Sequence, residues 1–290
     1  MQTRRGINLF FRFAIYFFAL IGFILTAGYF AVKWELTNSN SRIDEQDSFF
    51  QDNAVVKSDQ SYAVVNSAKN ESPEWSRGDE WLVFKTAVIK DRETLKKVES
   101  ATGIESRLVV SLLAVEQLRL YHTNRELFKK VFYPLKLLGN QSQFSWGVMG
   151  LKQDTTVQIE NHLKDSESPF YIGEGYENLL DFKSDNSGKE RFERIIDEHD
   201  RYYSYLYAAV HLKQIITQWK NAGYDISDRP EIISTLFNIG FQNSKPNTNP
   251  KVGGAEIKIK NKVYSFGSLA GEFYYSNELL EEFPRDRLEI

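Results

Sequence analysis

Twenty consecutive uncharged residues, Phe13 to Val32, lie between Arg12 and Lys33. As a helix, a segment of this length spans about 30 Å, the thickness of the hydrocarbon core of a bilayer. Aromatic residues flank it on both sides, as in helices that end at the lipid headgroups: Phe10, Phe11 and Tyr16 at the start, Tyr29, Phe30 and Trp34 at the end. The segment predicts a transmembrane helix, which would place the residues before it and the residues after it on opposite sides of a membrane.

Charge is distributed unevenly around this segment. Residues 1–33 carry four basic residues and no acid, so the rest of the chain holds 32 of the 36 basic residues and all 39 acids, a net charge of −7. The positive-inside rule then places the N-terminus in the cytoplasm. We expect residues 1–34 to be a cytoplasmic stub and single-pass anchor in the inner (cytoplasmic) membrane, with the remainder on the periplasmic or extracytoplasmic side.

A cleavable signal peptide is the alternative interpretation of the N-terminal segment. Its apolar region is ordinarily about 7–15 residues long and ends at a site of small residues, which Thr26-Ala27-Gly28 could supply. The apolar run continues past that point, which favours a retained anchor. Both interpretations export the rest of the chain.

Composition excludes several classes of function. The chain has no cysteine, which excludes disulfide scaffolds, thiol catalysis and iron–sulfur ligation. Its formal charge of −3 argues against nucleic acid as a partner, since phosphate binding needs a basic face. The four histidines show no metal-ligand spacing, and no phosphate loop or dinucleotide motif is present. We therefore expect no metal and no cofactor.

Beyond the anchor, residues 35–75 are polar and without a sustained period, and we interpret them as a stalk. Residues 76–290 form the predicted domain, which is mainly helical with one minor β-hairpin. Helical patterns cover 79–99, 104–120, 155–164, 189–221 and 229–239, and a last helix starts near 268. Thr102-Gly103 predicts a break, and Asn261-Lys262 predicts the turn of a hairpin over 256–266.

One carboxylate lies on an apolar helix face. Leu108, Leu112, Glu116 and Leu120 are four residues apart, so they share one side of a helix. Such a glutamate can be an edge residue, or it can pair with a buried arginine. It can also be a general acid, because partial burial favours the protonated carboxyl group that donates to a leaving oxygen.

Two later segments favour the general acid. Ser145–Gln153 contains two glycines three residues apart, which permit close backbone approach, although an ordinary turn is the simpler interpretation. Leu236–Gly240 places Asn238 two residues before a glycine, as a helix C-cap also would. The order and spacing of the two segments after Glu116 strengthen the signal.

Together these segments resemble the catalytic domain of lytic transglycosylases of the soluble, goose-lysozyme-like type. Thr102-Gly103-Ile104 to Glu116 resembles the helix that carries the family's catalytic glutamate. Ser145–Gln153 resembles its "S-x-G-A-M-G-L-M-Q" segment, and Leu236–Gly240 resembles its "A-Y-N-x-G" motif. The resemblance covers about residues 100–242 and implies a lysozyme-like fold, with the rest as a C-terminal extension.

The resemblance implies cleavage of the MurNAc-β-1,4-GlcNAc bond of peptidoglycan by a single acid, leaving a 1,6-anhydro end. Glu116 would be the acid and base, with Gln153, Asn238, Met149, Gly150 and Ser145 binding the glycan strand. Hydrolytic glycosidases use two carboxylates. Asp154 could be a second, but we interpret it as a helix N-cap.

The chain departs from the family pattern at several places. Gln117 stands where serine commonly follows the glutamate, Phe237 replaces a tyrosine, Lys152 replaces a methionine, and Tyr121–Gln141 is an insertion. Three alternatives therefore stay open. They are a non-catalytic relative that binds peptidoglycan or serves as an envelope scaffold, a helical subunit of an envelope assembly, and a hydrolase.

Overall fold

The structure is a computed structural model that describes residues 73–123, 145–197 and 199–285, together with 16, 22, 23 and 26. This part of the chain is mainly helical, as predicted, with two small two-stranded sheets. The predicted stalk and nearly all of Phe13–Val32 lie outside the described residues. Within the residues described, no helix combines the length and the apolar character needed to cross a bilayer.

The folded part begins before the boundary predicted at residue 76. Trp75, in the short 3₁₀ helix η1 (Glu74–Ser76), is only 1% exposed. Its ring lies 4.7 Å from that of Trp81, edge to face, and 5.9 Å from that of Phe273. Because these three large rings bury one another, Trp75 belongs to the domain core rather than to the stalk.

The helical pattern over 79–99 belongs to two helices, α3 (Asp79–Lys90) and α4 (Arg92–Thr102), which meet at Asp91. The carboxylate of Asp91 accepts hydrogen bonds from Arg201 (2.8 Å) and Tyr205 (2.5 Å), so the junction is held to a distant helix. Gly103 ends α4 with φ +69°, a conformation that glycine adopts without strain, as the predicted break requires.

The long helix predicted over 189–221 is two helices, which corrects that prediction. These are α8 (Ser187–Ile196) and α9 (Tyr202–Asn221). Asp197 separates them, because its carboxylate accepts the backbone N–H groups of His199 and Asp200. Aspartate side chains commonly stabilise turns in this way. The break between the helices therefore lies at Asp197, His199 and Asp200.

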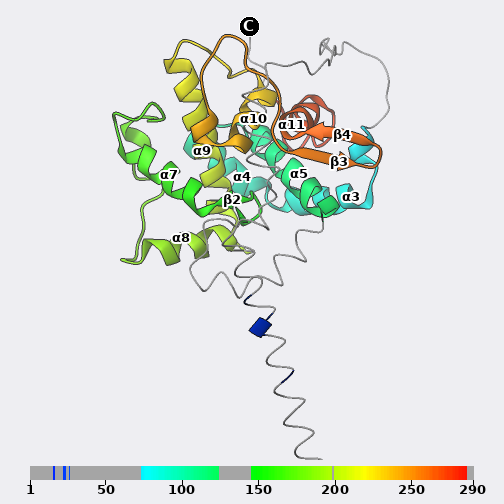
Figure 1. Cartoon of the computed structure of the whole chain (residues 1–290), viewed down its shortest axis with the longest axis horizontal. Helices are drawn as coiled ribbons and strands as arrows, with labels where there is room; N and C mark the ends of the chain where they lie inside the picture. Colours follow the sequence, from blue (N-terminus) through cyan, green and yellow to red (C-terminus); the bar gives the residue numbers. More distant parts are fainter. Residues whose placement is uncertain are drawn as a thin grey trace, which may run out of the picture.

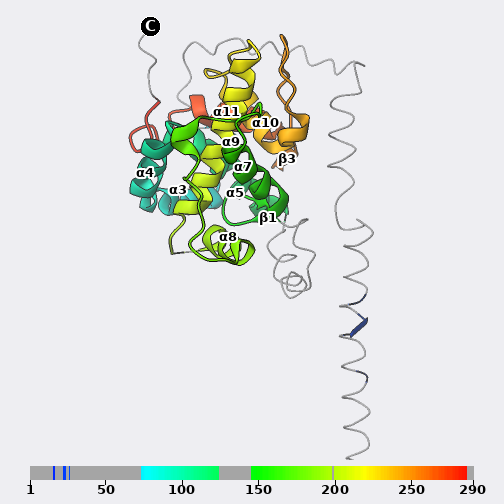
Figure 2. The ribbon, with the colours of Figure 1, turned by 90° about the vertical axis from the view of Figure 1, so that its left-hand side faces the viewer.

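Helix α9 lies at the centre of the domain. Every residue from Ser204 to Ile215 except Lys213 is buried, which is typical of a helix covered on all sides. It contacts five other helices: α4, α5 (Ser106–Thr123), α7 (Gln153–Lys164), α8 and α10 (Pro230–Ile239). Figures 1 and 2 show α9 passing between these elements in both views.

The predicted hairpin is present, with strands β3 (Glu256–Ile259) and β4 (Lys262–Ser265) paired antiparallel. Ile259 pairs with Lys262, so the turn is Lys260-Asn261, one residue earlier than predicted. The last helix, α11 (Phe266–Tyr275), starts at a capping box in which Ser265 and Ser268 bond each other's backbone. Strand β3 and helix α11 both pack on α5 (Ser106–Thr123), beside which the hairpin lies in Figure 1.

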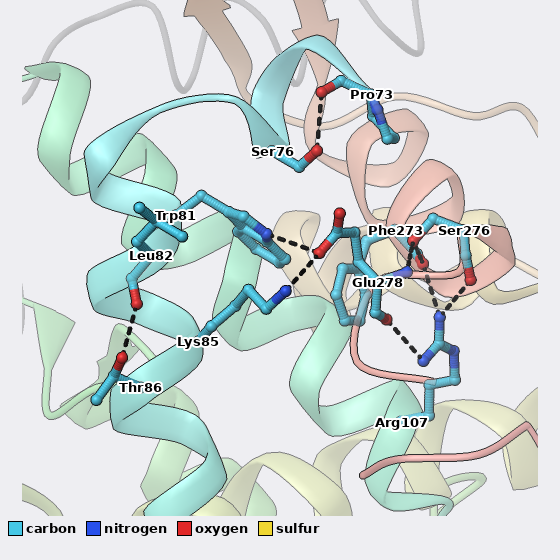
Figure 3. A network of polar contacts seen from close by, with 10 residues as sticks. All are labelled: Pro73, Ser76, Trp81, Leu82, Lys85, Thr86, Arg107, Phe273, Ser276 and Glu278. Atoms are coloured by element: carbon cyan, nitrogen blue, oxygen red, sulfur yellow. Dashed lines mark hydrogen bonds and ion pairs between the residues drawn. The ribbon is translucent and has the colours of Figure 1, made fainter. Parts of the chain in front are cut away.

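The segment after α11 is held by one buried arginine. Arg107 of α5 donates to the carbonyls of five residues, Phe273, Tyr274, Ser276, Glu278 and Phe283, at 2.8–3.2 Å. Figure 3 shows the guanidinium group among several of them, with Glu278 also accepting from Trp81 and Lys85. Burial, and then Arg285, lower the pKa of Arg107 to about 10, which still leaves it charged at neutral pH. The region we treated as an extension is therefore part of the core.

Candidate active site

Helix α5 places Glu116 deep in the domain. The residue is 2% exposed and lies among the buried residues Leu112, Leu113 and Val115 of its own helix. Its Oε2 atom accepts a hydrogen bond from Arg119 Nη2 at 2.5 Å, one turn further along the same face. Both side chains are almost fully buried, with 3% of Glu116 and 6% of Arg119 exposed, so the ion pair is shielded from bulk water.

A tight hairpin covers the Glu116 carboxylate. Strands β1 (Ser145–Trp146) and β2 (Leu151–Lys152) pair antiparallel, and residues 147–150 form the turn between them. Gly147 and Gly150 both have positive φ, at +61° and +62°. A Cβ at Gly150 would lie 2.9 Å from Glu116 Oε2, which is too close for any side chain. The backbone at Gly150 therefore lies directly on the carboxylate.

Gly147 and Gln117 fix the position of this turn. A Cβ at Gly147 would lie 2.3 Å from the carbonyl oxygen of Ile195, so α8 supports the turn from the other side. Gln117 donates its side-chain amide to the Val148 carbonyl at 3.0 Å, which ties the turn to α5. Gln117, a departure from the family pattern, thus has a defined structural role here.

The remaining residues of Ser145–Gln153 occupy different environments. Met149 is fully buried in the core, and Gly150 is half-buried against Glu116. Ser145 begins β1 and pairs through its backbone with Lys152. Gln153 is the first residue of α7, and its carbonyl accepts from the Thr156 hydroxyl. Asp154 lies inside the first turn of α7 while Lys152 holds the N-cap position, so the interpretation of Asp154 as the cap is wrong.

Asn238 lies near the end of α10, where its side chain has a structural partner. Its Oδ1 atom accepts the backbone N–H of Ala255 at 2.9 Å, and Gly254 approaches the same atom closely. Helix α10 ends at Gly240, with φ +83°. No hydrogen bond recorded for the described residues joins Asn238 to Glu116. Asn238 therefore orders the loop before β3.

Phe237 packs into an aromatic cluster at the junction of α9 and α10. Its ring centroid lies 5.0 Å from that of His211 and 6.5 Å from that of Phe266. The ring of His211 also lies 4.2 Å from Phe241, whose ring contacts His162 and Phe170. Phe237 is only 7% exposed, and a ring without a polar group is suited to so buried a position.

The tyrosines of α9 divide into two sets. Tyr205 and Tyr207 are buried and donate to Asp91 and Glu160, in each case at 2.5 Å, and burial is the main cause of their raised pKa values. Tyr202 and Tyr203 are half-buried, and the guanidinium carbon of Arg194 lies 4.3 Å from the Tyr203 ring centroid. The first set belongs to the core.

The structure thus brings Glu116, Arg119, Gln117 and residues 147–150 together, whereas Asn238 is engaged elsewhere. Arg119 is the residue of this group that the sequence argument left unnamed. The sequence feature that identifies Arg119 is its positive charge, three positions after Glu116 on the same helix face. No group of three or more acidic or histidine side chains suited to a metal ion occurs in the part of the chain that the structure describes.

No protein-family model, no curated protein and no solved structure matches the chain.

Proposed function

We propose that the chain is a membrane-anchored lytic transglycosylase that cleaves MurNAc-β-1,4-GlcNAc bonds of peptidoglycan on the extracytoplasmic side of the membrane. The observation that carries the proposal is the backbone at Gly150 lying on the Glu116 carboxylate. Glu116 and Gly150 are 34 positions apart in the sequence, and they belong to segments that resemble two motifs of one family. The two segments meet at the side chain that would perform the chemistry. The predicted helix Phe13–Val32 would supply the anchor.

The proposed reaction uses one carboxyl group twice, first as an acid and then as a base. Protonated Glu116 gives its proton to the glycosidic oxygen as the bond from that oxygen to C1 of MurNAc breaks. The resulting carboxylate takes the proton of the C6 hydroxyl of the same sugar, and that oxygen bonds to C1. Protons balance over the two steps, and no water is consumed. The proposed glycan-binding groups remain the backbone at Met149 and Gly150, together with Ser145, Gln153 and Asn238.

A specific observation also favours a second candidate function, a non-catalytic relative that binds peptidoglycan or serves as an envelope scaffold. Glu116 is almost fully buried and already paired with Arg119. An Arg–carboxylate pair of this kind can be a structural element of the core. In that case the domain would bind glycan strands without cutting them.

Digestion of purified peptidoglycan with the detergent-solubilised full chain, followed by mass spectrometry, distinguishes these functions. Wild type would release anhydro-muropeptides and Glu116→Gln would release none. Glu160→Gln is the matched control, because Glu160 is the acid of another, partly buried arginine pair, 2.5 Å from Arg191. That variant should retain activity at a temperature where it is folded.

Three other results would each redirect the assignment. Reducing-end products in place of anhydro products would identify a hydrolase. Binding to sacculi without release by any variant would favour the non-catalytic relative. Equal release by wild type and Glu116→Gln would remove Glu116 from the mechanism.

A further inference from the structure

The outer face of the β3–β4 hairpin combines a charged and an apolar side chain. In the pairing register Lys258 lies opposite Val263, whereas the neighbouring pair, Ile257 and Tyr264, is buried against the domain. Because successive residues of a strand point to opposite faces, Lys258 and Val263 share the outer face. Val263 is 57% exposed, and Glu256, the acid of the hairpin, is exposed at the other end of β3.

The turn of the hairpin holds a lysine in an unfavourable backbone conformation. Lys260 is exposed and has φ +54°, in the left-handed region that most residues with a Cβ avoid. Asn261, a residue type that tolerates this region better, stands one position later. Strained residues of this kind are concentrated at binding sites. The turn thus presents a second lysine next to Lys258 in spite of local strain.

The hairpin is a basic region of an acidic chain. Residues 251–265 contain four lysines and one acid, whereas the chain after residue 33 has a net charge of −7. Lys262 is engaged on the inner side, 3.5 Å from Glu272 of α11. Within the described residues, neither Lys258 nor Lys260 has a recorded partner for its ammonium group. Lysines on a short sheet discourage pairing with other strands, but that role does not require an exposed valine beside them.

The chain enters the domain near this hairpin. Burial, and then Glu272, raise the pKa of the Tyr264 phenol on β4, and Glu74 acts in the same direction. Such an effect requires the Glu74 carboxylate to lie close to the hairpin. Residues 35–72 connect this point to the predicted transmembrane helix and span at most about 130 Å when fully extended. A membrane held within that reach has a high local concentration, so weak affinity suffices for docking.

We propose that the outer face of the β3–β4 hairpin, centred on Lys258, Lys260 and Val263, docks on the anionic phospholipid surface of the membrane that carries the predicted anchor. The inference rests on the anchor in the proposed function and is independent of glycan cleavage. The two ammonium groups bind lipid phosphates, while the lysine stems and the valine reach the apolar edge of the headgroup layer. Each lysine at an anionic surface strengthens binding about fivefold.

The test reconstitutes the full chain in phosphatidylcholine vesicles with and without phosphatidylglycerol. Because the chain has no cysteine, Asn261→Cys carries a single fluorophore at the hairpin turn, and a nitroxide on the lipid headgroups quenches it on docking. We expect quenching with phosphatidylglycerol, and its loss in high salt, which screens exposed charges. Ser166→Cys is the control, since Ser166 is exposed two residues after α7, and α7 lies across the domain from the hairpin in Figure 1.

Charge and apolar variants of the labelled chain identify the docking face. Lys258→Gln/Lys260→Gln should lower the ratio of docked to undocked hairpins about 25-fold with unchanged thermal stability. Val263→Thr, which exchanges one methyl for a hydroxyl group, should lower it by a smaller factor. Lys97→Gln/Lys220→Gln removes the same charge from exposed positions on α4 and α9 and should leave docking unchanged. Absence of quenching, equal quenching without phosphatidylglycerol, or equal quenching in the hairpin lysine variant overturns the proposal.

An acidic polymer of the cell wall is the competing partner for this face. Sedimentation with peptidoglycan sacculi tests it with the same variants. If Lys258→Gln/Lys260→Gln loses binding to sacculi while its quenching in vesicles equals that of wild type, the face binds the wall and the membrane proposal fails.

Failure of the proposed function has a different signature. If alkaline carbonate extracts the chain from phosphatidylcholine vesicles, the predicted anchor is what fails. Salt-sensitive binding to phosphatidylglycerol vesicles, and its loss in Lys258→Gln/Lys260→Gln, then still decide whether the hairpin binds the lipid surface. Absence of anhydro product would remove the transglycosylase function without changing any of these readouts.

Discussion

Glycine 150 illustrates how a single residue can shape a site without contributing a side chain. Its positive φ and its contact with Glu116 are separate requirements, and each excludes other residues for its own reason. The first is a backbone strain of about 1–2 kcal/mol for most residues. The second is a steric conflict with the buried carboxylate of Glu116, which also accepts a hydrogen bond from Arg119.

Gly150→Ala should therefore lose more than the cost of its backbone angle. We expect a decrease in the free energy of unfolding of more than about 2 kcal/mol, measured in urea, together with loss of glycan cleavage. Gly223→Ala is the matched control, because Gly223 has φ +86° with nothing within 4 Å of its hypothetical Cβ. Gly223→Ala should lose only the stability that the backbone angle costs. If Gly150→Ala and Gly223→Ala lose the same free energy of unfolding, the contact between Gly150 and Glu116 is refuted.

His211 is a residue whose burial should be visible in the pH dependence of stability. Burial, and then His162, lower its pKa to about 3. Neither ring nitrogen has a hydrogen-bond partner among the described residues. The unfolded chain binds a proton here below about pH 6.5, whereas the folded chain stays neutral until about pH 3. Stability should therefore decrease as the pH falls through this window, by up to about 1.4 kcal/mol per pH unit.

In His211→Leu the free energy of unfolding should depend less steeply on pH, by nearly the slope that one proton contributes. Urea unfolding between pH 4 and 7 measures this slope. Part of the slope should remain, because burial also lowers the pKa of His162, against an opposing effect of Asp165. An unaltered slope in His211→Leu would mean that His211 is protonated in the folded protein.

At the scale of elements, helices α10 and α11 pack closely against each other. A Cβ at Gly267 would lie 2.0 Å from Thr235 Oγ1 and 2.5 Å from the Glu231 carbonyl, and one at Gly271 would lie 2.9 Å from Glu231 Cβ. Glycines four residues apart lie on one face of a helix, so together they let the two backbones approach. The Thr235 hydroxyl also bonds the Gly253 amide, which connects the helix pair to the loop before β3.

Gly267→Ala should force these helices apart. We expect a loss of about 1–3 kcal/mol in the free energy of unfolding, the usual cost of overpacking. Gly175→Ala, where nothing lies within 4 Å, should change stability by less than about 0.5 kcal/mol. A Gly267→Ala variant as stable as wild type would show that α10 and α11 are packed less closely than described.

At the scale of the whole molecule, the two ends of the domain are joined through α5. Arg107 binds five carbonyls of the segment from Phe273 to Phe283, while Trp75 and Trp81 pack against Phe273. The helix that carries Glu116 is therefore covered by both the first and the last described segments of the domain.

Arg107→Met should release the final segment, because five carbonyl groups lose a charged donor. We expect a loss of about 3–4 kcal/mol, with the amides of residues 276–283 losing their protection from hydrogen exchange first. Lys85→Met is the comparison, since the ion pair of Lys85 with Glu278 is partly exposed and should contribute less than about 1 kcal/mol. Unchanged protection in Arg107→Met would show that the segment is held by its apolar contacts alone.

Local features of the sequence determined much of the secondary structure. The apolar period of 104–120 predicted α5, Gly103 predicted the end of α4, and the alternation over 256–266 predicted the hairpin, each confirmed. Periodicity did not separate α8 from α9, because Asp197 and its neighbours are also acceptable on a helix surface. The break depends on backbone hydrogen bonds that a pattern of polarity does not contain.

The order of residues alone indicates an apolar segment of bilayer length, a helical domain, and a carboxylate on an apolar helix face. The packing of the folded chain adds that this carboxylate is paired with Arg119, that Gly150 lies on it, and that the Asn238 side chain accepts a hydrogen bond from Ala255. The physical reason is the range of the interactions. Helix periods and turns follow from neighbours a few positions apart, whereas burial and charge pairing depend on which distant segments the core brings together.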